Sequence, residues 1–133
     1  MKPEDITIGF DLDGTLINNN PQIERFTRQL LQAAHNSGYI TWVVSGHATD
    51  DVIDTICKLE LNQYVHLYLS KYEVTSTHRP DWMIDDNEFT VKTLSKFGGF
   101  HIDQERKKLV YYKNSDSISS EIIMEIGFGK RGI

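Results

Sequence analysis

Short apolar runs, each about the length of a strand, recur along the first hundred residues of the chain. They are rich in β-branched and aromatic side chains, and polar or turn-forming residues bound them. Runs of this kind are typical of strands that are buried in a sheet. The pattern therefore predicts four strands, over residues 6–11, 39–44, 64–70 and 81–84.

The segment between the first two runs has the features of a helix. Asn20 followed by Pro21 is an N-cap with proline at the first helical position. Apolar residues then recur at helical spacing, from Ile23 to Ala34, and Gly38 marks the end of the helix.

Two further helices are expected. Residues 50–60 carry apolar residues every three or four positions, and acidic residues at the start of this segment suit the helix dipole. Asn87 is a candidate cap for a helix over residues 88–97, which the glycine pair 98–99 would stop.

The alternation of strands and helices predicts an α/β fold with a mostly parallel central sheet and helices on its faces. Open sheets of this class place their ligands at the carboxyl ends of the strands. Five polar residues fall at such ends: Asp11, Asp13, Ser45, Lys71 and Asp85. We therefore expect a functional site along this edge of the sheet.

Beyond residue 99 the pattern is weaker. Residues 100–102 and 109–112 could pair as a hairpin. The isoleucines between Ile118 and Ile126 suit a short helix, with Asp116 or Ser117 as its cap, or alternatively a strand. We therefore expect a single domain over residues 1–133, with a catalytic core over about 5–97 and a C-terminal hairpin or helix extension over about 98–133.

Composition places the chain among ordinary globular proteins and suggests the cytoplasm. The 133 residues carry a net charge of −5, which argues against nucleic acid as a partner. No apolar stretch reaches the length of a membrane span, and the N-terminus lacks a secretory signal. The lone cysteine, Cys57, fits a reducing compartment and is expected to be a small core residue.

Asp11 and Asp13 are the most informative pair in the sequence. Residues i and i+2 of a strand point the same way, so both carboxylates would face one small volume, where their repulsion requires a cation or a shared proton. A calcium-binding loop starting at Asp11 would need glutamate at its twelfth position, where Gln22 stands. The pair therefore favours a metal-assisted catalytic site over a calcium loop or a solvated turn.

Three motifs in this order resemble the haloacid dehalogenase-like (HAD) superfamily of phosphohydrolases. They are Asp11-Leu12-Asp13-Gly14-Thr15-Leu16, Val43-Val44-Ser45-Gly46 and Met83-Ile84-Asp85-Asp86. The resemblance extends over about residues 5–97 and implies a three-layer Rossmann-like core. The gaps between the motifs have room for one helix each, so we expect a small member without a large cap domain.

The resemblance also implies roles for the motif residues. Asp11 would be the nucleophile that forms an aspartyl-phosphate, and Asp13 the general acid and base. Ser45 and the backbone N–H of Gly46 would hold the phosphoryl oxygens. The ligands of a Mg²⁺ ion would be Asp11, the backbone carbonyl of Asp13, Asp85 and Asp86.

The cation that neutralises the phosphate is less clear from the sequence, because two residues match different parts of the family pattern. Lys71 follows the third strand, whereas Arg79 precedes a proline, as the family's lysine often does. We favour Lys71 and keep Arg79 as the alternative. His47 and His78 flank the site in sequence and are either substrate contacts or exposed loop residues.

These features predict a Mg²⁺-dependent phosphatase that acts on a nucleotide or another small phosphometabolite. Without a cap, the active site would be open, borrow cover from a second copy in a homo-oligomer, or be covered in part by residues 98–133. Two alternatives stay open: a noncatalytic phosphate-binding or regulatory module on the same fold, and a phosphatase for nucleic-acid or protein phosphates.

Overall fold

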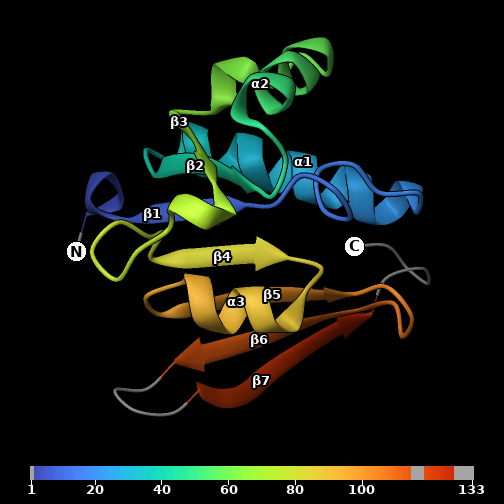
Figure 1. Ribbon diagram of the computed structural model, residues 1–133. Coiled ribbons are helices and arrows are strands. Elements are labelled where there is room, and N and C mark those ends of the chain that lie inside the picture. The colour runs from blue at the N-terminus through green and yellow to red at the C-terminus, as the bar shows by residue number, and fades with distance from the viewer. Residues whose placement is uncertain (1, 115–118, 128–133) are drawn as a thin grey trace.

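The computed structural model describes residues 2–114 and 119–127, and it contains one continuous sheet (Figure 1). The strand order is β3-β2-β1-β4-β5-β6-β7. The strands are β1 (Thr7–Phe10), β2 (Ile40–Ser45), β3 (Leu67–Ser70), β4 (Trp82–Asp85), β5 (Gly98–Asp103), β6 (Lys108–Asn114) and β7 (Ser119–Gly127). The helices are α1 (Pro21–Asn36), α2 (Thr49–Lys58) and α3 (Glu88–Leu94).

Strands β1 to β5 are parallel, and β6 and β7 extend the sheet in antiparallel pairing. The chain runs outward from β1 through β2 to β3, returns to the other side of β1 at β4, and continues outward through β5. The strand order thus reverses between β1 and β4. In open α/β sheets, ligands bind at the carboxyl ends of the strands at this reversal.

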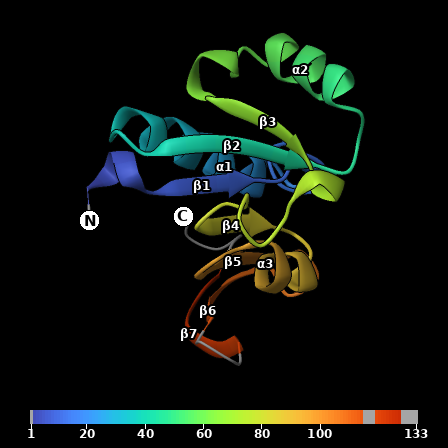
Figure 2. The same cartoon turned by 60° about the vertical axis from the view of Figure 1, so that its left-hand side comes forward.

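The helices form layers on both faces of the sheet (Figure 2). The main apolar core lies under α1 and α2, where Ile23 and Ile56 pack with Val43 of β2. Helix α3 packs through Val91 against Val110, which faces away from its neighbour Leu109 in the main core. The arrangement therefore has three layers, which confirms the α/β Rossmann-like fold predicted from the sequence.

One part of the second face is covered by a loop instead of a helix. Between β3 and β4 the chain forms only a short 3₁₀ helix, Lys71–Glu73, before the loop that leads to Pro80. This loop covers a small apolar cluster that includes Val44 and Met83, and Gly9 lets it lie close to the sheet. A Cβ atom at Gly9 would lie 2.9 Å from the sulfur of Met83 and 3.0 Å from Cγ of Pro80.

The glycine pair 98–99 has a different role from the one the sequence predicts. Helix α3 ends at Leu94, and the two glycines are the first residues of β5. A Cβ atom at Gly99 would lie 1.8 Å from the carbonyl oxygen of Met83, and one at Gly98 would lie 2.1 Å from that of Tyr112. The pair is therefore required by close contact with the backbones of β4 and β6.

The segment Ser119–Gly127 is a strand and not a helix. The expected hairpin is confirmed, because β5 and β6 pair as antiparallel neighbours. The helix interpretation of the following isoleucines is wrong where the structure describes them, since Ser119–Gly127 forms β7. Its alternative, a strand, is correct, because β6 offers an unpaired edge that a third strand completes. Residues 116–118, including the two cap candidates, lie outside the described residues.

The segments between β1 and β2 and between β2 and β3 hold α1 and α2 and no inserted domain, as the spacing of the motifs predicts. Within the described part of the chain, no helix combines the length and the apolar character that crossing a bilayer requires.

The N-cap of α1 provides a test of how the first helix is fixed. The side chain of Asn20 accepts hydrogen bonds from the backbone N–H groups of Gln22 and Ile23, at 2.9 and 3.3 Å. We expect Asn20→Ala to lower the free energy of unfolding by about 1 kcal/mol, measured by urea denaturation. The matched control is Asn19→Ala at the exposed neighbouring position, which should change it by less than about 0.5 kcal/mol. Equal effects of the two substitutions would contradict the capping role.

Candidate active site

The carboxyl ends of β1, β2 and β4 surround a surface cavity of about 460 Å³. Its lining combines carboxylates, a lysine, an imidazole, a hydroxyl and an amide, and the described residues that line it include no apolar side chain. The lining residues are Asp11, Asp13, Ser45, Gly46, His47, Lys71, Asp86 and Asn87. The structure thus brings together most of the residues that the sequence places at strand ends.

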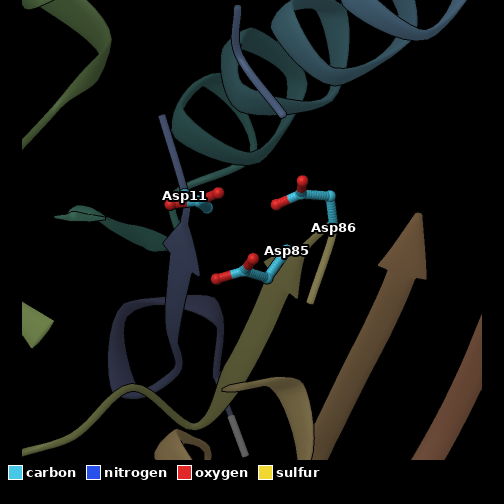
Figure 3. Close-up of side chains that lie close together, drawn as sticks. All are labelled: Asp11, Asp85 and Asp86. Atoms are coloured by element: carbon cyan, nitrogen blue, oxygen red, sulfur yellow. The ribbon is translucent and has the colours of Figure 1, made fainter. Parts of the chain in front are cut away.

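Three carboxylates converge beside this cavity (Figure 3). Asp11 follows β1, Asp85 is the last residue of β4, and Asp86 comes directly after it. One oxygen of each carboxylate lies within 4.8 Å of the other two. Asp11 is 4% exposed and Asp85 is fully buried. Such proximity of like charges is costly unless cations offset it.

Lys71 supplies one of the offsetting charges. Its Nζ atom lies 3.2 Å from Oδ1 of Asp11 and 3.0 Å from Oδ2 of Asp85. The turn that carries Lys71 is fixed by a capping box, in which Ser70 and Glu73 each accept a hydrogen bond from the backbone of this turn. Arg79, the other candidate cation, is half-buried in the loop before β4 and does not line the cavity.

Burial and mutual repulsion shift the protonation of these groups. Burial, reinforced by the charge of Asp85, raises the pKa of Asp11 to about 8, even though Lys71 lowers it. Burial also raises the pKa of Asp85 to about 6, against the opposing effect of Lys71. Burial disfavours the charged form of Lys71, but the two carboxylates outweigh it and raise the pKa of Lys71. One ammonium therefore compensates the carboxylates only in part.

Asp13 and Ser45 also line the cavity. The Asp13 side chain is 60% exposed and contacts Nε2 of His47. Ser45 is buried at the end of β2, and its Oγ atom accepts a hydrogen bond from the backbone N–H of His47 at 3.2 Å. His47 is therefore an exposed residue that lines the cavity, and its contact with a substrate stays a prediction. His78, by contrast, packs against Trp42 with 5.0 Å between ring centroids.

Asp86 is held by residues that lie outside the predicted catalytic core. Gln104 donates a hydrogen bond from Nε2 to Oδ2 of Asp86 at 3.2 Å. Nε2 of His101 in β5 lies 3.1 Å from the backbone oxygen of Asp86. On the other side, Asp86 packs over Gly14, whose φ is +85° and whose Cβ atom, if present, would lie 2.1 Å from Oδ2 of Asp86. The segment beyond residue 97 therefore supports the site directly.

The three carboxylates fit a hard divalent cation. Oδ2 of Asp85 is buried and, in the described part of the chain, makes no hydrogen bond beyond its ion pair with Lys71, while Oδ1 accepts from the backbone N–H of Asn87 at 3.0 Å. Mg²⁺ prefers oxygen ligands, and carboxylates are its usual protein ligands. Asp11, Asp85 and Asp86 could therefore hold a metal ion whose charge would relieve their repulsion.

The repulsion has a measurable consequence for the metal-free protein. A carboxyl whose pKa is raised on folding contributes stability at low pH that is lost as the pH rises through the folded-state pKa. In EDTA, we therefore expect the free energy of unfolding to fall as the pH rises from about 4 to about 8. Asp85→Asn should reduce this fall and be more stable than wild type at pH 8 by roughly 1–3 kcal/mol.

Asn can still accept from the N–H of Asn87, and Lys71 keeps its ion pair with Asp11, so Asp85→Asn removes little besides charge. Urea denaturation at several pH values measures the difference, with Asp54→Asn on the exposed side of α2 as the matched control. An Asp85→Asn variant that is less stable than wild type at pH 8 would contradict this account.

Comparison with known proteins gives one result that bears on this geometry. A protein-family model described as haloacid dehalogenase-like hydrolase matches residues 8–127. The searches of curated proteins and of solved structures each gave no significant match. The family match covers all seven strands from the second residue of β1 to the end of β7, including the three motifs whose residues form the cavity. The chain therefore belongs to the haloacid dehalogenase-like hydrolases.

Proposed function

We propose that this hydrolase cleaves phosphomonoesters through an aspartyl-phosphate on Asp11. The observation that carries the proposal is the placement of the buried Asp11 carboxylate. It faces a cavity that also contains a cation, Lys71, an exposed carboxylate, Asp13, and a hydroxyl, Ser45. Groups suited to act as nucleophile, proton donor and phosphate ligand thus line one cavity, which supports stepwise phosphoryl transfer.

In the first step, a carboxylate oxygen of Asp11 attacks phosphorus, and the bond from phosphorus to the ester oxygen breaks. Asp13 gives its proton to the departing oxygen, so the leaving group departs as an alcohol. Asp13 suits this role because it lies on the cavity wall and its side chain is exposed to solvent, from which it can exchange protons.

In the second step, water attacks the phosphorus atom of the aspartyl-phosphate. Asp13, now ionised, takes a proton from this water, and the bond from phosphorus to the Asp11 oxygen breaks. Inorganic phosphate leaves, and both carboxyl groups return to their starting states. The use of one residue as acid and then as base follows from the symmetry of the two displacements.

The transferring phosphoryl group needs donors and positive charge around its oxygens. Ser45 and Gly46 line the cavity at the end of β2, and Lys71 lines it from the turn after β3. Preorganised donors of this kind stabilise charge that develops in the transition state. Lys71 therefore serves in the proposal both as the partner of Asp11 and as a ligand of the phosphate.

The proposed cofactor is Mg²⁺, held by Asp11, Asp85, Asp86 and the backbone carbonyl of Asp13. When bound, it would neutralise phosphate charge and favour the ionised form of Asp11. Gly14 and Gln104 would keep Asp86 in place for this role, and the N–H of Asn87 would orient Asp85. We further propose that the substrate is a small phosphorylated metabolite of the cytoplasm.

Replacement of the nucleophile tests the mechanism. Asp11→Asn should lower kcat for hydrolysis of an aryl phosphate in Mg²⁺ to the background rate, because an amide cannot form the aspartyl-phosphate. Wild type should lose activity in EDTA and regain it with added Mg²⁺. The control Asp54→Asn changes the same side chain on exposed α2 and should keep wild-type activity. An Asp11→Asn variant that still turns over would exclude Asp11 as nucleophile.

If wild type is inactive toward aryl phosphate and a broad phosphometabolite panel, trapping with beryllofluoride separates the two remaining interpretations. Asp11-dependent binding of beryllofluoride would support a phosphorylatable enzyme with a strict substrate requirement. Its absence, together with binding of phosphorylated ligands, would support a noncatalytic phosphate-binding module instead.

The proposed role of the Ser45 hydroxyl at the end of β2 predicts a partial loss of activity when it is removed. Ser45→Ala removes one donor to the phosphoryl oxygens and should lower kcat by about 10²-fold, as for the loss of an oxyanion-hole donor. Steady-state kinetics on the aryl phosphate measure the effect. Ser76→Ala, an exposed serine in the loop after β3, is the matched control and should have no effect. A change of less than about threefold in Ser45→Ala would remove Ser45 from the phosphate site.

A further inference from the structure

A second cavity adjoins the candidate active site on the side of α2. Its volume is about 200 Å³, and it lies between the loop after β1 and the first two turns of α2. The lining residues are Leu12, Asp13, Ile17, His47, Asp51, Val52 and Thr55. Asp13 and His47, which contact each other, line both cavities. The contacting pair thus forms the boundary between the two spaces.

The position of this boundary decides what the second cavity can hold. The proposed mechanism places the phosphoryl group between Asp11, Ser45 and Lys71, and it requires Asp13 to reach the ester oxygen of the leaving group. The rest of the leaving group must then extend past Asp13, away from Lys71. The second cavity is lined by Asp13, whereas Lys71 lines only the first of the two cavities.

The walls of the cavity have a defined chemistry. Leu12 and Val52 are buried and Ile17 is half-buried, so they form an apolar floor. The rim is polar, with the exposed carboxylate of Asp51 and the half-buried side chain of Thr55 on adjacent turns of α2. Asp50 and Asp54 on the same helix are also exposed and add to the negative charge of this region. No lysine or arginine is among the described residues that line the cavity.

The second cavity is smaller than the first. Its volume of about 200 Å³, compared with about 460 Å³, suits a compact alcohol. An apolar floor with a carboxylate at the rim favours a short carbon chain that ends in a cationic or hydrogen-bond-donating group. A leaving group with its own carboxylate or phosphate would instead meet the charges of Asp13 and Asp51.

We propose that this second cavity is the leaving-group subsite, and that it selects phosphomonoesters of compact cationic alcohols, such as amino alcohols, over those of anionic alcohols. The proposal rests on the proposed phosphatase function and deepens it, since it names the substrate class of the same site. Asp51 is the specificity-determining residue, and Leu12, Ile17 and Val52 provide the apolar contact.

Three phosphomonoesters of two-carbon alcohols test the charge preference, because they differ only at the far end. They are the esters of ethanolamine, ethylene glycol and glycolate, which carry an ammonium, a hydroxyl and a carboxylate. In Mg²⁺, we expect kcat/KM to fall in that order. We define the charge preference as kcat/KM for the cationic ester divided by kcat/KM for the anionic ester. Asp51→Asn should lower this ratio by about fivefold or more, and Asp51→Lys should reverse the preference.

Two further variants make the test specific to the cavity. Asp54→Asn makes the same change of charge on α2 at a residue that does not line the cavity, and it should leave the ratio within about twofold of wild type. Thr55→Trp fills the space, and the hydrogen bond that it removes lies within α2, from the Thr55 hydroxyl to the carbonyl of Asp51. It should weaken binding of the esters while inorganic phosphate still binds.

A binding arm separates failure of this proposal from failure of the proposed function. Calorimetric titration of the three esters into Asp11→Asn in Mg²⁺ measures affinity without turnover, and should give the same order, with the same dependence on Asp51.

Hydrolysis of all three esters at similar kcat/KM, unchanged in Asp51→Asn, would overturn the subsite and leave the phosphatase function standing. Ordered, Asp51-dependent binding with no hydrolysis by wild type would support the subsite and overturn the phosphatase function. Absence of both would overturn the subsite.

Discussion

The contact of the Lys71 ammonium with both Asp11 and Asp85 is the interaction on which the site depends. Two carboxylates from adjacent strands are buried side by side at the reversal of strand order, and among the described residues Lys71 is the cation that contacts both of them. Lys71 comes from the turn after β3, two strands away from β1 in the sheet. The position of the Lys71 charge beside the two carboxylates therefore depends on the capping box around this turn and on the pairing of β3 with β2.

Local patterns were sufficient to predict the parallel half of the fold. Strands β1 to β4 and helices α1 to α3 lie close to the positions that the apolar runs and the helical spacing predict. Each of these patterns buries its apolar side chains on one side of the backbone in only one type of secondary structure, either a strand or a helix. The glycine pair 98–99 and the isoleucines of β7 were harder to interpret. Their conformations depend on neighbours that are remote in sequence, the backbones of β4 and β6, and local periodicity carries no information about them. Cys57 is likewise exposed on α2, although its position beside an apolar stripe predicts burial.

The site shows the same division between local and long-range information. Asp11, Ser45 and Lys71 line one cavity, and Asp85 contacts Lys71 beside it. Their convergence follows from their positions at the ends of parallel strands, which the order of the elements is sufficient to predict. The contacts of Gln104 with Asp86 and of His47 with Asp13 depend on strand order and side-chain direction. The sequence alone likewise does not identify Asp86 as the side chain that packs over Gly14.

The loop between β3 and β4, which covers β1 and β2 on one face, gives the turn that carries Lys71 a lower local stability than the strands that carry Asp11 and Asp85. On one face of the sheet, α1 and α2 bury the main apolar core. On the other face of β1 and β2, the cover is the loop between β3 and β4, which contacts the sheet through Val74 and Pro80. Layers with few buried apolar contacts are the first to open in native-state fluctuations. Such an opening would free the turn that holds Lys71 while the strands that carry Asp11 and Asp85 stay folded. Catalytic competence would then be lost by a subglobal transition, at a temperature or denaturant concentration below that of global unfolding.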